Sequence, residues 1–192
     1  MAEVVRALRI LLHICCGPCA CYPVGALRSQ GHEVTGFFYN PNIQPFREFE
    51  RRLEALRSLA ESEGVPLVED LEYDIVAYLK AALADPGFPA RCGPCYLKRL
   101  DRAAAYARRE GYDAFSTTLL VSPYQRHDGV KDAGERASLE HGIPFYYEDF
   151  RPGWGQGMKI AREKGLYRQG YCGCVFSEVE RYRKTGGPGD AS

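Results

Sequence analysis

Three short groups of cysteines carry the residues best suited to chemistry in this chain of 192 residues. The groups are the run CCGPCAC at residues 15–21, the run CGPC at residues 92–95 and the run CGC at residues 172–174. A Cys-x-x-Cys spacing can bring two sulfurs onto one metal, and four thiolates complete a tetrahedral zinc site or hold a cubic iron–sulfur cluster. The groups together predict a composite metal site assembled from distant segments, with zinc and iron both open.

Other chemistry fits the residues around these cysteines less well. A lone Cys-x-x-Cys is also typical of a thioredoxin-type redox pair, and a small buried hydrophobe is an equally good interpretation of Cys21. No glycine-rich phosphate loop follows the first expected strand, so ATP and dinucleotide binding have no support. The sequence contains neither GxSxG nor HExxH, the motifs typical of serine hydrolases and zinc proteases.

Charge and hydropathy restrict the cellular compartments and the partners that we expect for the protein. The 25 basic and 25 acidic residues cancel, so no global field draws the chain to nucleic acid or to a membrane. The apolar run within residues 1–14 is shorter than the ~7–15 residues of a secretory leader or the ~20 of a membrane span. We therefore expect a cytoplasmic protein with no membrane partner, in which clustered thiols stay reduced and serve metal or redox chemistry.

Strand-like and helix-like segments alternate along the chain and must position the cysteines. The hydrophobic pattern predicts strands at residues 9–13, 34–39, 66–68, 113–120 and 143–147. It predicts helices at residues 22–30, 45–64, 74–83, 95–110 and 132–141. This order favours an α/β fold, a Rossmann-like three-layer domain with a mostly parallel sheet and helices on both faces. We expect a single domain over residues 1–184 and a disordered tail at residues 185–192.

The carboxyl ends of parallel strands form the usual binding crevice of such a sheet. Three segments should meet there, at residues 15–21, 39–44 and 117–128. The first of them is the cysteine-rich run, expected to be a loop between a strand and a helix. Its cysteines therefore start from a position where function is common.

Two of the predicted helices carry many charged residues. In the helix after Pro45, Arg52 is expected on a charged face that points to solvent. In the helix after Cys95, Arg99 and Arg102 belong to a locally basic set, separate in sequence from the acidic stretch at residues 69–74. A basic face over this helix is a candidate RNA-binding surface despite the zero net charge.

Five blocks of sequence then follow one another in a particular order. They are HICCGPC at residues 13–19, FFYNPNI at 37–43, RCGPC at 91–95, STTLLVSPY at 116–124 and YRQGYCGC at 167–174. In this order and register they resemble the QueH family of cobalamin-independent epoxyqueuosine reductases. Five blocks in register are far more specific than any one of them.

The resemblance implies an activity and a cofactor. Members of this family reduce epoxyqueuosine at the wobble position of tRNA to queuosine, and they hold a 4Fe–4S cluster. Carried over residue by residue, the cluster ligands are Cys15, Cys16, Cys92 and Cys95. Cys172 and Cys174 match the redox-active pair of the family. The implied partners are tRNA carrying epoxyqueuosine at the wobble position and an unidentified electron donor.

Further roles are hypotheses that follow from this chemistry. Cys19 is offered as a ligand to an additional iron adjacent to the cluster. Epoxide reduction also needs a proton donor, and Tyr124, His127 and Asp128 share one polar loop at the expected carboxyl edge. His127 is the first choice because an imidazole titrates near neutral pH.

Two other functions stay open. A zinc-binding, RNA-binding module would hold zinc with Cys92, Cys95 and two further cysteines, and would have no use for the run at residues 172–174. An iron–sulfur thiol oxidoreductase without an RNA substrate would carry a cluster but would be indifferent to tRNA. Metal content and the response to tRNA distinguish both from the reductase.

Overall fold

The sheet is small and entirely parallel in the computed structural model, which describes residues 6–183. Its strands lie in the order β3-β2-β1-β4, with β1 at Arg9–His13, β2 at Glu33–Phe38, β3 at Leu67–Glu69 and β4 at Ala114–Thr117. β1 is paired on both sides, since Leu12 lies opposite Gly36 of β2 and Ser116 of β4. Every residue of β1 after the first is buried, as expected for a parallel strand covered on both faces.

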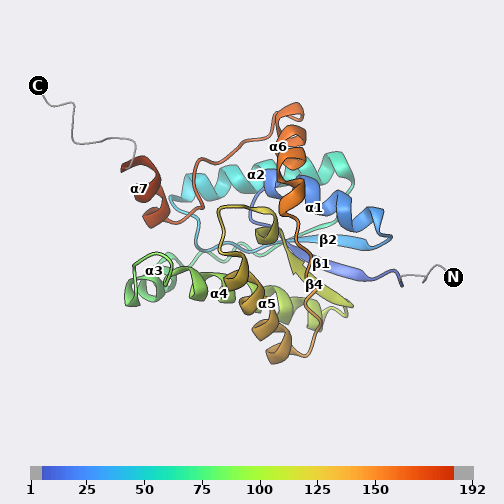
Figure 1. The fold of residues 1–192 in the computed structure, drawn as a ribbon, viewed down its shortest axis with the longest axis horizontal. Coiled ribbons are helices and arrows are strands. Elements are labelled where there is room, and N and C mark those ends of the chain that lie inside the picture. Colours follow the sequence, from blue (N-terminus) through green and yellow to red (C-terminus); the bar gives the residue numbers. More distant parts are fainter. Residues whose placement is uncertain (1–5, 184–192) are drawn as a thin grey trace, which may run out of the picture.

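Helices cover both faces of this sheet (Figure 1). One layer consists of α1 (Gly17–Ser29), α2 (Phe46–Glu63) and α6 (Trp154–Glu163), and the other of α4 (Cys92–Arg109) and α5 (His127–His141). The predicted three-layer α/β architecture is therefore confirmed. Two further helices, α3 (Ile75–Ala84) and α7 (Val175–Arg183), lie beyond the carboxyl ends of the strands, on the left in Figure 1.

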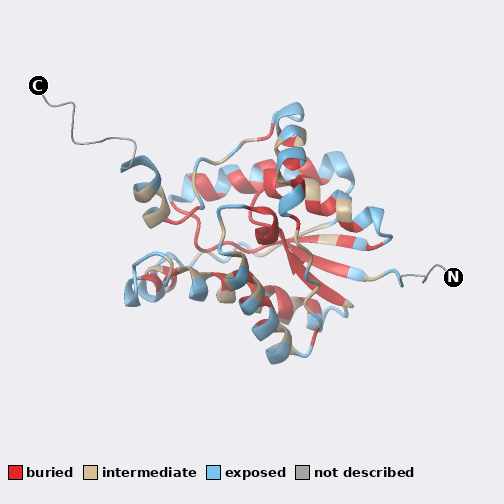
Figure 2. Cartoon of the chain, viewed as in Figure 1, coloured by how far each residue is buried: buried red, intermediate tan, exposed pale blue. Residues whose placement is uncertain are grey.

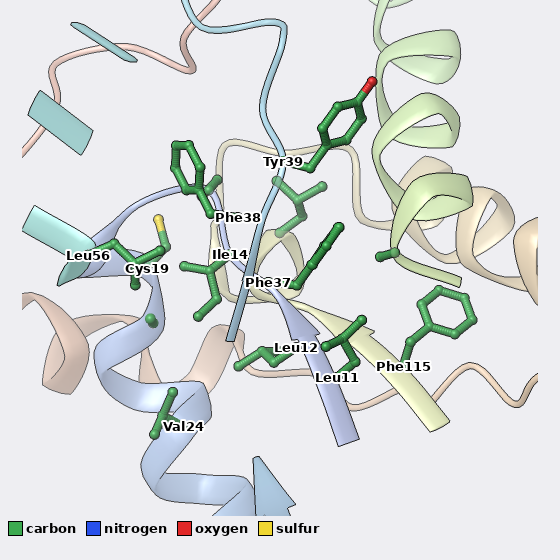
Figure 3. Close-up of a cluster of buried hydrophobic side chains, with 14 of the residues drawn as sticks. Leu11, Leu12, Ile14, Cys19, Val24, Phe37, Phe38, Tyr39, Leu56 and Phe115 are labelled. Carbon is green, nitrogen blue, oxygen red and sulfur yellow. The ribbon is translucent and has the colours of Figure 1, made fainter. Parts of the chain in front are cut away.

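Apolar side chains between the layers form one continuous core, which Figure 2 shows in red around the strands. Leu12 and Phe37 of the sheet have no exposed surface. Figure 3 shows that Cys19 belongs to the same cluster as Ile14 and Leu56. The first cysteine group is thus built into the core, where solvent is excluded.

Three helices begin earlier than the sequence pattern predicts. α5 begins at His127 instead of residue 132, so His127 and Asp128 lie in its first turn and not in the predicted loop. α1 begins at Gly17, and Pro18 occupies its first turn, where the missing amide hydrogen would have no helical partner anyway. α4 begins at Cys92 instead of Cys95. The expected loop is therefore confirmed for Cys15 and Cys16 but wrong for Cys19, Cys21, Cys92 and Cys95, which lie in helices. The close packing of α1 on α2 requires glycine, since a Cβ on Gly17 would lie 2.6 Å from the Ala55 carbonyl oxygen.

The last predicted strand, at residues 143–147, does not form. Only Phe145 makes a bridge, to Phe115, and Pro144 beside it has no amide hydrogen to extend the ladder. β4 is also shorter than predicted, because residues Thr118–Val121 form the 3-10 helix η1.

The carboxyl-terminal elements were not predicted. Gly155 and Gly157 lower the helix propensity of α6, so the pattern gave little sign of it. The 3-10 helix η2 (Arg151–Gly153) and α6 pack on α1, where a Cβ on Gly153 would overlap the Tyr22 ring. The expected tail at residues 185–192 lies outside the described residues. Within residues 6–183 no helix is both long and apolar enough to span a membrane.

Candidate metal and redox site

The carboxyl ends of three strands are joined by one buried histidine. The Nδ1 atom of His13 lies 2.9 Å from Thr117 Oγ1, and its Nε2 atom lies 3.2 Å from the carbonyl oxygen of Tyr39. Because a carbonyl only accepts, Nε2 carries the proton, and Thr117 donates its hydroxyl to Nδ1. Burial, helped by the charge of Arg99, lowers the pKa of His13 to about 4, so the ring is neutral. The three segments expected at this edge do meet.

Three cysteine sulfurs gather immediately after β1. The ligand atoms of Cys15, Cys16 and Cys19 all lie within 4.8 Å of one another, and all three residues are buried. Cys16 and Cys19 are three residues apart across the first turn of α1, which places them on one side of the helix. The first group is therefore compact and local, formed by one continuous run.

Polar side chains hold the sulfurs of this group. Thr118 Oγ1 lies 3.7 Å from the Cys15 sulfur and accepts the Cys15 amide at 3.3 Å. Gln169 Nε2 donates to the sulfur of Cys16 at 2.8 Å and to that of Cys19 at 3.6 Å. Hydrogen bonds from Cys16 and Cys19 lower the pKa of the Cys15 thiol well below its usual value. Cys15 is thus the first of the three to become a thiolate, the form that binds metal.

Cys21 lies outside this group. Its thiol is directed to the carbonyl oxygen of Gly17 at 3.5 Å, one turn back along α1. Burial raises its pKa to about 11, so the thiol stays neutral. Its interpretation as a small buried side chain agrees with this geometry.

The other four cysteines form a second neighbourhood, built from α4 and from residues 172–174. Cys174 packs with Tyr78, Ala82 and Cys95 in a small apolar cluster. Burial raises the pKa of Cys95 to about 12, and the nearby charges of Cys172 and Cys174 act in the same direction. Cys172 is exposed, whereas Cys174 is buried. All eight cysteines are free thiols.

The loop carrying Cys172 and Cys174 is fixed by α2 and the segment before it. Arg52 donates to the carbonyl oxygen of Cys172 at 2.9 Å and to that of Tyr171 at 3.1 Å. The amide of Gln44 donates to the Gly173 carbonyl oxygen at 2.8 Å. Gly173 has φ +133°, and a Cβ there would lie 3.2 Å from Arg52 Nη1. Glycine is thus needed at this position both for its backbone conformation and for its space.

Arg99 of α4 lies between the two cysteine groups. It is 2% exposed, and its Nε donates to the Cys95 carbonyl oxygen at 3.1 Å. Burial by itself would lower the pKa of Arg99, but the negative charges of Cys95, Cys172 and Cys15 outweigh it and raise the pKa. A permanent buried cation thus faces sulfurs from both groups, which stabilises thiolates and other anionic sulfur species there.

Two expectations about charged faces are wrong. Arg52 and Arg99 do not point to solvent, since both are nearly fully buried against the cysteine segments. The basic face over α4 is also reduced, because Arg102 pairs with Asp70 and Glu72 from the acidic stretch at distances of 2.6 and 2.7 Å. Segments far apart in sequence are side by side in the fold, so their charges neutralise each other.

The segment that carries the predicted proton donors contacts the second group. Tyr124 is strongly exposed, and Asp128 lies exposed in the first turn of α5. His127 begins α5, and its Nε2 lies 2.9 Å from the Tyr147 hydroxyl. Gln125, which follows Tyr124 in the chain, is the residue of this segment that contacts a cysteine. Its Nε2 lies 3.2 Å from the Cys172 sulfur.

Sequence reasoning missed four polar residues that contact the cysteine segments. They are Arg52, Arg99, Gln125 and Gln169. The two arginines were placed on solvated faces, and amides are poor motif residues because they do not titrate or ligate zinc. The only signal was position, since Gln125 and Gln169 lie within or next to sequence blocks that end at the site.

The donor set fits a metal or an iron–sulfur cluster. Thiolates are the ligands that zinc and iron–sulfur clusters prefer, and three buried sulfurs lie within reach of one centre. Arg99 Nη2 is buried without a hydrogen-bond partner among the described residues, which suits a negatively charged group beside the cysteines. The four cysteines implied as cluster ligands share Cys15 and Cys16 with the compact group, while Cys92 and Cys95 lie in the second neighbourhood.

Comparison with known proteins decides the family. The sequence profile described as "Epoxyqueuosine reductase QueH" matches residues 10–180. The chain belongs to the QueH family. An epoxyqueuosine reductase QueH of Dehalococcoides mccartyi is 40% identical over 182 residues, which cover 95% of this chain and 99% of that protein. The QueH of Thermotoga maritima is 37% identical over 182 residues, with 91% of this chain and 93% of that protein covered.

Likeness to solved structures is much weaker. The A40926 pseudoaglycone deacetylase Dbv21 matches with a TM-score of 0.47 at 15% identity, covering 94% of this chain and 93% of that chain. A deacetylase of teicoplanin biosynthesis matches with a TM-score of 0.45 at 11% identity over 94% of this chain and 93% of that chain. Similarity at this level supports no conclusion about the function of a QueH protein.

Proposed function

We propose that this chain reduces epoxyqueuosine in tRNA to queuosine. The reaction removes the epoxide oxygen as water and consumes two electrons and two protons. The observation that carries the proposal is the buried group of three sulfurs at the carboxyl edge of the sheet, in a chain that is 40% identical to a QueH protein over 95% of its length. The names of the relatives supply the substrate, and the sulfur chemistry of this chain is consistent with it.

The proposed cofactor is a 4Fe–4S cluster, which would supply electrons one at a time. The cluster ligands follow the resemblance, at Cys15, Cys16, Cys92 and Cys95. Cys19 is proposed as a ligand to an additional iron, and its sulfur does lie within 4.8 Å of those of Cys15 and Cys16. Arg99 supports this assignment, since its buried charge interacts with both Cys15 and Cys95.

Cys172 and Cys174 are proposed as a two-electron store. Oxidation of two thiols to one disulfide releases two electrons and two protons, which matches what one epoxide consumes. A disulfide across a single glycine closes a small strained ring, and strain makes a disulfide easier to reduce again by the external electron donor. The exposed Cys172 is the member of the pair that a donor can reach.

Proton delivery is proposed for His127, with Tyr124 and Asp128 in the same segment. Support comes from position, because Gln125 of this segment contacts the Cys172 sulfur. The Tyr147 hydroxyl 2.9 Å from His127 holds the imidazole in place. The reduced thiols and the tRNA substrate are both consistent with the cytoplasm.

The decisive test is the metal content and spectrum of protein purified without oxygen. Brown absorbance that bleaches with dithionite, at least about four irons per chain, and conversion of epoxyqueuosine to queuosine in tRNA are expected. Colourless protein with stoichiometric zinc and no cluster after reconstitution would sink the proposal and favour the zinc-binding module. A reconstituted cluster without any effect on tRNA would favour a thiol oxidoreductase.

The ligand set is tested by two single variants. If the proposed ligands are right, Cys92→Ser lowers iron to well below four per chain, whereas Cys19→Ser removes only iron in excess of four. If Cys19→Ser lowered iron well below four and Cys92→Ser did not, Cys19 would be a cluster ligand and Cys92 would not.

A further inference from the structure

An exposed aromatic pair stands at the edge of the cysteine site. Tyr124 is 78% exposed, the largest exposure of any aromatic side chain described. Its ring meets Trp154 edge to face, with centroids 6.0 Å apart and planes at 83°. Trp154 thus contacts the Tyr124 ring while most of the tyrosine surface remains exposed, which makes aromatic surface available to a ligand.

The segment that follows Tyr124 is hydrogen-bonded to the second cysteine group. The Tyr96 hydroxyl accepts the Arg126 amide at 3.3 Å and donates to Gln125 Oε1 at 2.8 Å. The other end of the Gln125 amide reaches the Cys172 sulfur at 3.2 Å. Tyr124, next in the chain to Gln125, is therefore carried by a segment whose two following residues are tied to a buried tyrosine and to the redox pair.

Lysine and imidazole side chains of α5, the helix that follows Tyr124 in the chain, contact a further aromatic ring, that of Tyr147. Lys131 lies 4.9 Å from the ring centroid of Tyr147, and His127 contacts the same ring at 5.7 Å. The exposed Arg126 adds a second cation. Asp149, two residues after Tyr147, is paired with Arg151 at 2.6 Å, so part of the negative charge is already neutralised.

We propose that Tyr124 and Trp154 form a stacking platform for an unstacked base of the anticodon loop of the substrate tRNA. The proposal rests on the proposed function, and it adds the surface that recognises the RNA. Aromatic faces stack on bases of any sequence, and nearby cations hold the phosphates between them. The platform lies beside Cys172, so a base stacked there brings its neighbour in the loop towards the cysteine site.

A nucleic acid fits this surface better than a protein partner does. A docked protein typically needs a contiguous apolar area, whereas here one strongly exposed ring contacts Trp154 and is followed in the chain by Gln125 and the exposed Arg126. One exposed ring with lysine and arginine nearby has the composition of a single-base site.

Trp154 provides a direct probe, because it is the only tryptophan of the chain. Titration of the reduced holoenzyme with an anticodon stem-loop RNA, of the sequence that carries queuosine, should quench its fluorescence. Binding is measured in parallel by the anisotropy of labelled RNA. We expect Tyr124→Leu to weaken binding about tenfold or more, and Tyr124→Phe to retain it, since stacking needs the ring and not the hydroxyl.

Tyr112→Leu is the matched control. Tyr112 also has a cation over its ring, Arg9 at 5.1 Å, but it precedes β4 and so lies at the opposite edge of the sheet. The variant Tyr112→Leu should therefore leave the affinity for RNA unchanged. A readout beyond affinity is KM against kcat: Tyr124→Leu should raise KM for tRNA and Tyr124→Phe should not, whereas a fall of kcat in Tyr124→Phe would show that the hydroxyl acts in proton delivery and not the ring in binding.

Two failures can be told apart. If wild-type protein converts epoxyqueuosine in tRNA but Tyr124→Leu binds and turns over normally, the platform is wrong and the reductase function stands. If wild-type protein neither binds the stem-loop nor converts the substrate, the proposed function fails, and the platform with it. Quenching of Trp154 that persists unchanged in Tyr124→Leu, with unchanged affinity, also overturns the platform.

Discussion

The two cysteine groups are built in different ways. The first consists of Cys15, Cys16 and Cys19, which one continuous run brings within 4.8 Å of one another. The second joins the first turn of α4 to residues 172–174, and among residues 6–183 no three of its sulfurs come that close together. The first group is buried throughout, whereas the second includes the exposed Cys172.

This difference separates two kinds of chemistry. A metal needs several ligand atoms at fixed short distances, and a helical first turn supplies them with little dependence on the rest of the fold. A redox pair needs access to partners and freedom to change its bonding, which a loop with one exposed cysteine allows. The compact group therefore supplies three preformed metal ligands, to which the proposed cluster adds Cys92 and Cys95 of the second group. Cys172 and Cys174 form the better electron store, with Arg99 as the charge that both groups share.

The largest expected effect separates metal content from turnover. Cys16→Ser removes a sulfur from the compact group, so we predict loss of most of the bound iron. The double variant Cys172→Ser, Cys174→Ser should keep its iron while turnover falls by more than about a hundredfold, because the electron store is gone. Iron analysis and a tRNA conversion assay measure the two quantities.

Cys21→Ser is the control for this experiment, since its thiol contacts only a backbone carbonyl. It should change neither quantity by more than a small factor. Loss of iron from the double variant would contradict the proposed electron store, and would make Cys172 and Cys174 metal ligands.

The anchor of the second group should carry a large share of stability. Arg52→Leu leaves the buried Glu48 carboxylate without its ion pair at 2.8 Å, and frees the Cys172 carbonyl. We predict a loss of about 3–5 kcal/mol in the free energy of unfolding, measured by urea denaturation. Arg57→Leu on the same helix breaks an exposed pair with Glu69 and should cost less than about 1 kcal/mol. Equal losses would show that Arg52 acts only as a surface charge.

Gly173→Ala tests whether the second group depends on one backbone conformation. A Cβ at φ +133°, 3.1 Å from Ile43 and 3.2 Å from Arg52, should cost about 1–3 kcal/mol and displace the redox pair. Iron bound by the compact group should be unaffected. Gly25→Ala, where a Cβ would meet nothing within 4 Å, should be neutral or slightly stabilising because it lies inside α1. Unchanged turnover in Gly173→Ala would argue that the pair tolerates movement.

The smallest expected effects distinguish the two glutamines. Gln169→Leu removes the hydrogen bond to Cys16 and should lower metal affinity about tenfold, with a more negative reduction potential of the bound metal. Gln125→Leu removes the contact to Cys172 and should change the thiol–disulfide potential without altering metal affinity. Chelator competition measures the metal affinity, and redox titration measures the potentials of the metal and of the thiol–disulfide pair. Identical effects of the two variants would mean that the groups are one site.

The sequence predicted the scaffold well where the hydrophobic pattern itself determines the structure. β1 and α2 follow directly from apolar periodicity, and the meeting of strand ends follows from parallel topology. The prediction failed where tertiary contacts determine whether and where an element forms. The start of α1 at Gly17 depends on close packing against Ala55, and the 143–147 strand was lost because only Phe145 finds a partner.

The site was predictable in its cysteines and not in their surroundings. Cysteine spacing is visible in the sequence, but the burial of Arg52 and Arg99 arises only when α2 and α4 pack beside the cysteine segments. An arginine on a charged helix gives no sequence signal that it faces inward. Arg102 shows the opposite case, since its partners Asp70 and Glu72 are distant in sequence.

The position of Gln169 has a consequence for how the protein is made. The first cysteine group leaves the ribosome early, whereas the side chain that covers Cys16 and Cys19 comes near the end of the described chain. During synthesis three thiols are therefore displayed long before their cover exists. A nascent chain lacking residues 166–183 offers an open set of sulfur ligands, and the arrival of the last segment closes it. The amide that hydrogen-bonds to these sulfurs is therefore among the last parts of the site to be synthesised.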